Sequence, residues 1–191
     1  MAGRAAHEIR NPLNGLSVSV EVLRSRLARG DVAPQSVQPF AESAAEELRR
    51  VTPLLEALLA LARQPRTPVD LWTAVEPVLR LHAAVAAAHG GAVMTAVPAD
   101  PLPAYPGDPL LARLACACAL EAFTEPGTQV KCTARRDASA VTLEFWGSAP
   151  PAPPDATIKA VLARAGIRLV AAAQTISVCC PATGPRTDRE T

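Results

Sequence analysis

The sequence has no long apolar run and no excess of charge of either sign. Every apolar run in the 191-residue chain ends well short of the roughly 18 residues that suggest a membrane span, and the N-terminus lacks the hydrophobic region of a signal peptide. Lys and Arg number 19 against 18 Asp and Glu, for a formal net charge of +1. We therefore expect a cytoplasmic protein that binds neither a membrane nor nucleic acid.

The cysteines lack the pairing that disulfides require. There are five of them, an odd number, and they lie inside apolar stretches, which favours small buried residues over disulfides. A zinc site built from Cys116 and Cys118 has weak support, because neither a second pair of cysteines nor a nearby histidine accompanies them. We expect no metal site on this chain.

Two segments near the N-terminus carry apolar residues at alternating spacings of three and four. This spacing is typical of helices that pack as in a coiled coil. Gly30 and Pro34 mark a turn between the segments, which predicts an antiparallel helical hairpin. A hairpin alone cannot close a core, so we predict a homodimer in which two copies form a four-helix bundle. The seam residues are Ile9, Leu13, Leu16, Val20, Leu23 and Leu27 in the first helix and Phe40, Ala44, Leu48, Val51, Leu55, Leu58 and Ala62 in the second.

The pattern changes at Gln64–Val69, where two prolines end the helical repeat and mark a domain boundary. Short helical and strand-like segments follow, which makes the fold class α+β, a helical hairpin followed by a small α/β sandwich. We assign residues 1–64 to the hairpin, 69–182 to the α/β domain and 183–191 to a disordered tail. Helices are predicted at 71–88, 110–123 and 155–173, strands at 92–97, 130–136, 141–146 and 175–180, a proline-rich loop at 98–109 and a hairpin turn at 137–139.

The stretch HEIRNPLNGL, which begins at His7, combines polar residues with the start of the first seam. With the leucines facing the core, His7, Asn11 and Asn14 lie at i, i+4 and i+7 along the solvent-facing stripe, and Glu8 is adjacent to His7. A lone histidine on a helix surface usually has no special role. Neutral imidazole is nevertheless a competent nucleophile near neutral pH and can carry a phosphoryl group.

The residues His-Glu-Ile-Arg-Asn-Pro-Leu at 7–13 strongly resemble the H-box of bacterial sensor histidine kinases. The segment 47–63 is similar to the second helix of that family, so the resemblance covers the whole hairpin. It implies that His7 is the phosphoacceptor, that Glu8 orients or deprotonates the ring, and that Asn11 lies beside the phosphoryl group. Pro12 removes one helical hydrogen bond, which we expect to bend the helix just after the acceptor.

The family's second domain binds ATP through an asparagine-bearing helix, a DxGxG loop and a glycine-rich lid. The order of elements after Val69 is similar, but the residues that carry the chemistry are missing. Cys118 stands where the resemblance places the magnesium-binding asparagine, and Trp146–Pro151 replaces the adenine-reading aspartate and flexible glycines. No lid glycines follow, and the helix that starts near Asp155 comes directly after this loop. We therefore expect no nucleotide and no other cofactor on this chain.

The chain thus resembles the dimeric histidine phosphotransferases of bacterial phosphorelays, which have a kinase-like architecture but do not bind ATP. The resemblance implies response-regulator receiver domains as partners, Mg²⁺ supplied by the receiver, and a hybrid histidine kinase upstream. Two alternatives remain open: a sensor kinase fragment that still autophosphorylates, and a non-catalytic dimeric scaffold or inhibitor that docks kinases or receivers. Retention of Glu8 and Asn11 favours the first alternative, and the intact His7–Glu8 pair argues against the second.

The remaining polar and aromatic candidates have ordinary structural interpretations. We expect His82 and His89 to be structural or surface residues, and Trp72 and Trp146 to fill the core or a domain interface rather than stack on a ligand. Asp108, directly before a proline, is predicted to cap the following helix at its N-terminus.

Overall fold

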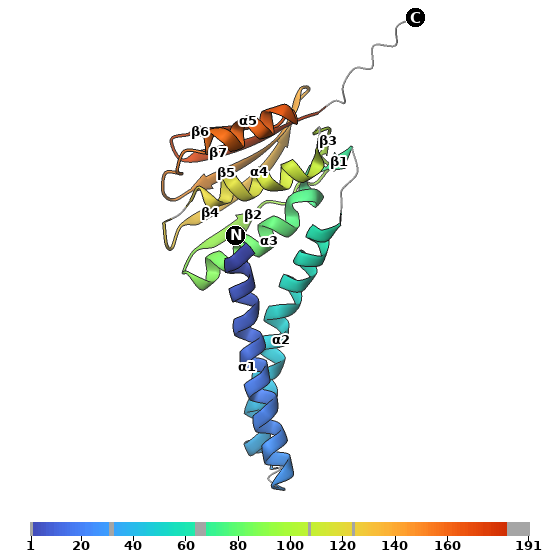
Figure 1. Ribbon diagram of the computed structural model, residues 1–191, viewed down its shortest axis with the longest axis vertical. Coiled ribbons are helices and arrows are strands. Elements are labelled where there is room, and N and C mark those ends of the chain that lie inside the picture. The colour runs from blue at the N-terminus through green and yellow to red at the C-terminus, as the bar shows by residue number, and fades with distance from the viewer. Residues whose placement is uncertain (1, 31–32, 64–67, 107, 124, 183–191) are drawn as a thin grey trace, which may run out of the picture. The chain divides into compact units, whose positions relative to one another are not determined.

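The computed structural model describes residues 2–30, 33–63, 68–106, 108–123 and 125–182. The chain forms two compact units, unit 1 from Met1 to Ala60 and unit 2 from Leu61 to Thr191 (Figure 1). The expected boundary at Gln64–Val69 lies largely outside the described residues, and the expected disordered tail at 183–191 lies wholly outside them. Among the helices that the structure describes, none combines the length and apolarity needed to cross a bilayer.

Unit 1 is a helical hairpin. Its helices are α1 (Ala2–Ala28) and α2 (Pro34–Ala62), which confirms the two predicted seams as helical. Gly30, at the turn, has a φ of 75°, a backbone conformation that glycine adopts without steric cost. The helix α1 continues through Pro12.

The contact between the two helices uses only part of each seam. In α2 the buried residues are Ala44, Val51, Leu54 and Ala57. On α1 Ser19 is buried, and its hydroxyl donates a hydrogen bond to Ser43 Oγ at 3.2 Å. This bond gives the buried Ser19 hydroxyl a partner on the other helix.

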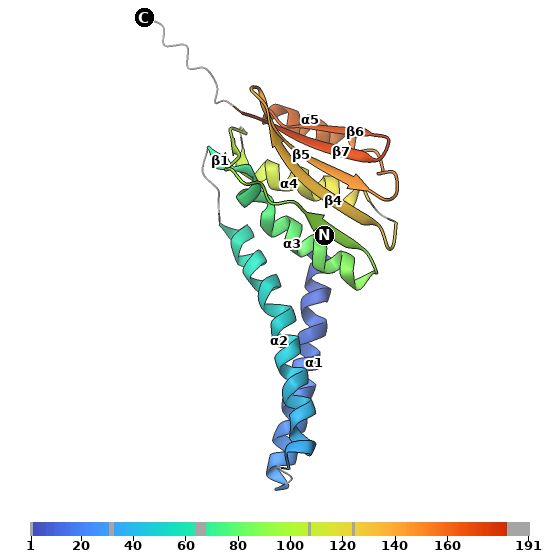
Figure 2. The ribbon, with the colours of Figure 1, turned by 180° about the vertical axis from the view of Figure 1, so that it is seen from behind.

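Unit 2 is an α/β layer. Its main sheet has the strand order β2-β4-β5-β7-β6, in which β2 and β4 are parallel and the other neighbours antiparallel. The helices α3, α4 and α5 lie on one side of the sheet, and Figure 2 shows the strands from the opposite side. The elements are β1 (Val69–Asp70), α3 (Leu71–Ala88), β2 (Ala92–Thr95), β3 (Pro103–Ala104), α4 (Pro109–Glu121), β4 (Gln129–Arg136), β5 (Ala140–Gly147), α5 (Ala156–Arg164), β6 (Arg168–Ala172) and β7 (Thr175–Pro181).

Each helix of unit 2 begins at an aspartate that caps it. The Asp70 and Asp108 carboxylates accept hydrogen bonds from the amides of Trp72 and Leu110. Asp155 accepts two, and these lower the pKa of its carboxyl. The predicted cap at Asp108 is confirmed. Because an aspartate side chain satisfies amides that have no helical partner, these positions determine where the helices start.

The core of unit 2 lies between the helices and the sheet. Along the central strands, the residues that face the helices are fully buried, among them Leu143 and Phe145 of β5 and Ile176 and Val178 of β7. Arg113 of α4 is half-buried and contacts α3 and residues 61–63. Its guanidinium donates to the carbonyls of Ala74, Leu61 and Arg63, and burial lowers its pKa.

Two sequence predictions are wrong. The helix predicted at 155–173 ends at Arg164, and its second half is the strand β6. Gly166, with a φ of 73°, terminates the helix, and pairing with β7 then holds residues 168–172 extended. The loop predicted at 98–109 contains β3, which pairs with β1. Trp146 was expected in the core or at a domain interface; 49% of its surface is exposed, which excludes the core of unit 2.

Substitution of Gly147 should destabilise unit 2 strongly. A Cβ atom at this position would lie 2.3 Å from two carbons of the Phe123 ring and 2.8 Å from the carbonyl oxygen of Ala149. Overpacking of this kind costs up to about 3 kcal/mol, so we expect Gly147→Ala to lower the free energy of unfolding by about that amount in urea titrations. Gly15→Ala is the control, because its Cβ would meet only the flexible Glu47 side chain at 3.4 Å. A loss below about 1 kcal/mol for Gly147→Ala would contradict the packing described here.

Candidate functional site

The predicted phosphoacceptor lies on the surface of α1. His7 and Asn11 are exposed and lie one helical turn apart, while Glu8 is half-buried and adjacent in the chain. Within the described residues, no hydrogen bond joins the His7 ring to Glu8 or Asn11. The imidazole is therefore open to a partner that approaches this face of the helix.

Pro12 is buried just beyond these residues. Its nitrogen carries no hydrogen, so the carbonyl of Glu8, four residues earlier, has no helical donor. One turn further along, Gly15 lies against the side chain of Glu47 on α2. The absence of a Cβ at Gly15 leaves room for this carboxylate between the helices.

Both helices of unit 1 retain a stripe of exposed leucine and valine beside the surface that joins them. These six residues are spaced by seven on α1 and by seven and four on α2, and between 41% and 66% of the surface of each is exposed. We call them the exposed stripe. It lies on the side of α1 roughly opposite to His7, because successive residues of a helix are separated by about 100°. The exposed stripe consists of Leu13, Val20 and Leu27 on α1 and Leu48, Leu55 and Leu59 on α2.

Among the positions that the resemblance compares with nucleotide ligands, Cys118 carries a thiol and the segment 146–151 carries no carboxylate. Cys118 of α4 is half-buried, and burial together with the nearby carboxyl groups of Glu121 and Asp155 raises the pKa of its thiol. Phe145 of β5 is fully buried, and the ring of Phe123 lies directly against Gly147. Neither a neutral thiol nor an aromatic ring is a suitable ligand for Mg²⁺, which prefers charged oxygen.

The loop after β5 is fixed at both ends. The Ser148 amide donates to the Gln129 carbonyl at 3.0 Å, and the Ser148 hydroxyl accepts from the Gln129 amide at 3.1 Å. Further along, the Ala152 amide donates to the carbonyl of Ala122 at 2.8 Å. The sequence signal for this connection is the four prolines at 150, 151, 153 and 154, whose φ angles are restricted.

The five thiols are free, and three of them are buried. Burial raises the pKa of Cys132 to about 12 and, with a smaller effect of Cys179, that of Cys180 to about 12. The three buried cysteines, Cys116, Cys132 and Cys180, therefore act as small residues of the core. Among the residues that the structure describes, no three His, Cys, Asp or Glu side chains are grouped so that they could hold a metal ion.

The other candidates belong to unit 2. His82 is half-buried in α3, and His89 is exposed after it, with Nδ1 2.8 Å from the Val85 carbonyl oxygen. Trp72 is buried, as predicted for a core residue. Sequence reasoning missed the contact between Phe123 and Gly147, for which the sequence pattern carries no periodic signal.

The sequence of the hairpin matches a known family of domains. Residues 1–66 match the family of the His Kinase A (phospho-acceptor) domain, and this match includes His7, Glu8 and Asn11. No curated protein sequence matches the chain significantly.

Three solved structures match the chain at low sequence identity. The Acinetobacter baumannii histidine kinase AdeS is 14% identical over 93% of this chain and 98% of its own, with a TM-score of 0.49. Histidine kinase ThkA, solved in complex with response regulator protein TrrA, is 17% identical over 96% of this chain and 61% of its own, with a TM-score of 0.48. A bacterial phosphotransferase is 14% identical over 94% and 92%, with a TM-score of 0.46.

The α+β fold places a two-helix phospho-acceptor segment before a mixed sheet covered by helices on one side. The H-box residues stand on the first of those two helices, inside the matched segment. Residues 1–66, about a third of the chain, are therefore similar to the His Kinase A (phospho-acceptor) domain.

Proposed function

We propose that this chain is a phosphorelay histidine phosphotransferase that moves a phosphoryl group between receiver-domain aspartates through His7. A ring nitrogen of neutral His7 attacks the phosphorus of an aspartyl phosphate, an N–P bond forms, and the bond from phosphorus to the aspartate oxygen breaks. Transfer to a second receiver reverses these steps. The observation that carries the proposal is the exposed His7 on a helix of the matched phospho-acceptor family.

Glu8 and Asn11 support this chemistry by their positions on α1. Glu8 is adjacent to His7 and can accept the proton that the ring loses as the N–P bond forms, or orient the ring. Asn11, one turn away on the same side, can donate its amide hydrogens to phosphoryl oxygens. The receiver supplies Mg²⁺, which neutralises the phosphoryl charge when that domain is bound.

The proposed assembly is a homodimer formed through unit 1. Within the described part of the hairpin, the two helices bury Ala44, Val51, Leu54 and Ala57 and leave the exposed stripe open. A second hairpin would cover that stripe and close a four-helix bundle. His7 would remain accessible, because it lies on the other side of α1.

The proposed reaction uses no ATP. Cys118 provides a neutral thiol, and the Phe123 ring fills the space beside Gly147. We expect calorimetry with ATP and Mg²⁺ up to about millimolar concentration to detect no binding, and labelled ATP to leave the protein unlabelled. The positive control is the same preparation, which should acquire label from a phosphorylated receiver domain.

This experiment separates the alternatives. Saturable, Mg²⁺-dependent ATP binding with label on His7 would identify an autophosphorylating kinase fragment instead, a function that the retained Glu8 and Asn11 also permit. Binding of the receiver without any label on His7 would identify a non-catalytic scaffold. Label from the receiver and none from ATP supports the phosphotransferase.

A further inference from the structure

The strand β2 forms one edge of the main sheet, and β4 is its neighbour in that sheet. The Ala96 amide, directly after β2, donates to the Cys132 carbonyl of β4 at 3.0 Å. Because the backbone groups of successive strand residues point to opposite sides, the amides and carbonyls of Val93 and Thr95 point away from β4. In the part of the chain that the structure describes, these groups have no hydrogen-bond partner. A row of unsatisfied backbone groups at a sheet edge is a template for another extended chain.

A groove lies beside this edge. The helix α3 packs against β2 (Figure 1), and a cavity of about 130 Å³ between them is partly open to solvent. Trp72, Leu79 and Ala83 of α3 form one wall of the groove, and Val93 and Thr95 form the other. A cavity of about 150 Å³ with apolar walls holds a group of the size of benzene. The groove therefore has room for one apolar side chain.

The unsatisfied backbone groups and the groove belong to the same two residues. In a strand that pairs with β2, the residues directly opposite Val93 and Thr95 place their side chains on the same side of the sheet, which is the side of the groove. The residues between them point to the other side of the sheet. A helix uses its own amides and carbonyls internally, so an extended chain is the form of polypeptide that satisfies this edge.

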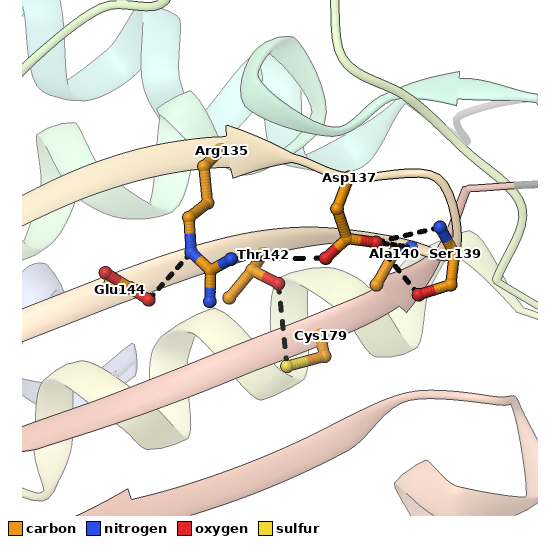
Figure 3. Close-up of polar contacts among 7 residues, drawn as sticks. All are labelled: Arg135, Asp137, Ser139, Ala140, Thr142, Glu144 and Cys179. Atoms are coloured by element: carbon orange, nitrogen blue, oxygen red, sulfur yellow. Dashed lines mark hydrogen bonds and ion pairs between the residues drawn. The ribbon is translucent and has the colours of Figure 1, made fainter.

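A cation lies near the edge on the side of the sheet that faces away from the helices. Lys131 of β4 is exposed there, aligned with Met94 of β2, and within the described residues it has no ion-pair partner. The neighbouring carboxylate of Glu144 already accepts a hydrogen bond from Arg135 at 2.9 Å (Figure 3). A strand added to β2 would lie two strand spacings from β4, about 10 Å, which a lysine and a glutamate side chain span together. This charge favours an acidic residue on the added strand.

A second copy of β2 does not supply such a residue. On the side of Lys131 it carries Ala92, Met94 and, directly after the strand, Ala96. We propose that the edge of β2 binds an extended segment of a partner protein in which apolar and acidic residues alternate. The backbone bonds to β2 would provide affinity, and the groove and Lys131 would select the side chains. This proposal does not depend on the function assigned to His7.

A synthetic peptide tests the proposal on the full chain. The probe is a labelled peptide of about eight residues in which Val and Glu alternate, and a second peptide carries Lys in place of Glu. Fluorescence anisotropy should show saturable binding of the acidic peptide in the micromolar range. Binding should also slow hydrogen exchange of the Val93 and Thr95 amides about 10-fold when about nine-tenths of the protein is bound, because only the free fraction exchanges. The Met94 amide, which faces β4, is the internal control.

Two N-methylated peptides test the backbone pairing without any change to the protein. One carries methyl groups on the Val amides and the other on the Glu amides. In a strand only one of these two sets of amides faces β2. One of the two peptides should therefore bind at least about 10-fold more weakly than the unmodified peptide, while the other keeps its affinity.

Substitutions test the groove and the cation. Ala83→Phe should fill the groove and weaken binding at least about 10-fold, whereas Ala87→Phe, at an exposed position of α3 outside the groove, should leave the affinity unchanged. Lys131→Glu should reverse the preference between the acidic peptide and the Lys peptide.

Four results would overturn the proposal. They are no saturable binding of the acidic peptide, binding that leaves the exchange of the Val93 and Thr95 amides unchanged, equal effects of the two N-methylated peptides, and equal binding of the Lys peptide. Slower exchange of these amides as the concentration of the peptide-free protein rises would also overturn it, because a second copy would then cover the edge.

Discussion

His7→Gln is expected to abolish the transfer of phosphate from a phosphorylated receiver domain. Glutamine has no nucleophilic ring nitrogen, and the side chain is exposed on α1, so its replacement should not disturb the packing of unit 1. The measurement is radiolabel on the protein after incubation with the labelled receiver. The label on the wild-type protein should be acid-labile and base-stable, the behaviour of phosphohistidine.

Matched variants decide whether His7 is the only residue that accepts phosphate from the receiver. His82→Gln and His89→Gln change the other two histidines of the chain and should be labelled as the wild type is. The His7→Gln protein should still bind the receiver and keep its oligomeric state, which excludes misfolding as the cause of lost labelling. Full labelling of His7→Gln would show that the acceptor is another residue.

Glu8→Ala tests how the acceptor is activated. General-base catalysis typically contributes about 10²–10⁴ in rate, so the variant should be labelled slowly but to completion. The half-buried position of Glu8 beside the exposed ring is compatible with either proton transfer or orientation of the ring. An unchanged rate would exclude both roles.

Replacement of two leucines of the exposed stripe should dissociate the proposed dimer without unfolding the hairpin. Leu48→Glu with Leu55→Glu removes four leucines from each bundle, since both copies change. At about 1.5 kcal/mol or more for each buried leucine, the loss is about 6 kcal/mol, or roughly 10⁴ in the dissociation constant. Both positions are more than 40% exposed within one chain, so the charges should be tolerated in the separated hairpin.

Light scattering at micromolar concentration measures the dissociation of the dimer. Two control variants show whether a lost dimer results from the exposed stripe or from unfolding. Val18→Glu adds a charge at a residue that is 64% exposed on the His7 side of α1, and it should remain dimeric. Val51→Glu places a charge in the buried contact between α1 and α2, and it should unfold the hairpin. A wild-type protein that is monomeric at these concentrations would exclude the proposed assembly.

Local chemistry made part of the structure predictable. The helices α1 and α2 follow from an uninterrupted apolar repeat, and the helix α3 was placed at residues 71–88, as observed. The start of α4 follows from Asp108 and the proline after it. The β4–β5 hairpin follows from two alternating segments around Asp137, whose carboxylate closes the turn. Each of these features depends on residues a few positions apart in the chain.

The sequence by itself determined the hairpin, the helix caps and the H-box with His7, because periodicity, capping and motif spacing are local properties. Only the tertiary structure decided that residues 168–172 form β6, since pairing with β7 overrides the helical preference of an alanine-rich segment. The tertiary structure also decided which seam leucines stay exposed and which side of the sheet carries Trp146. A periodic pattern shows that a residue is apolar, but its burial depends on which elements lie opposite it, and those contacts join residues far apart in the chain.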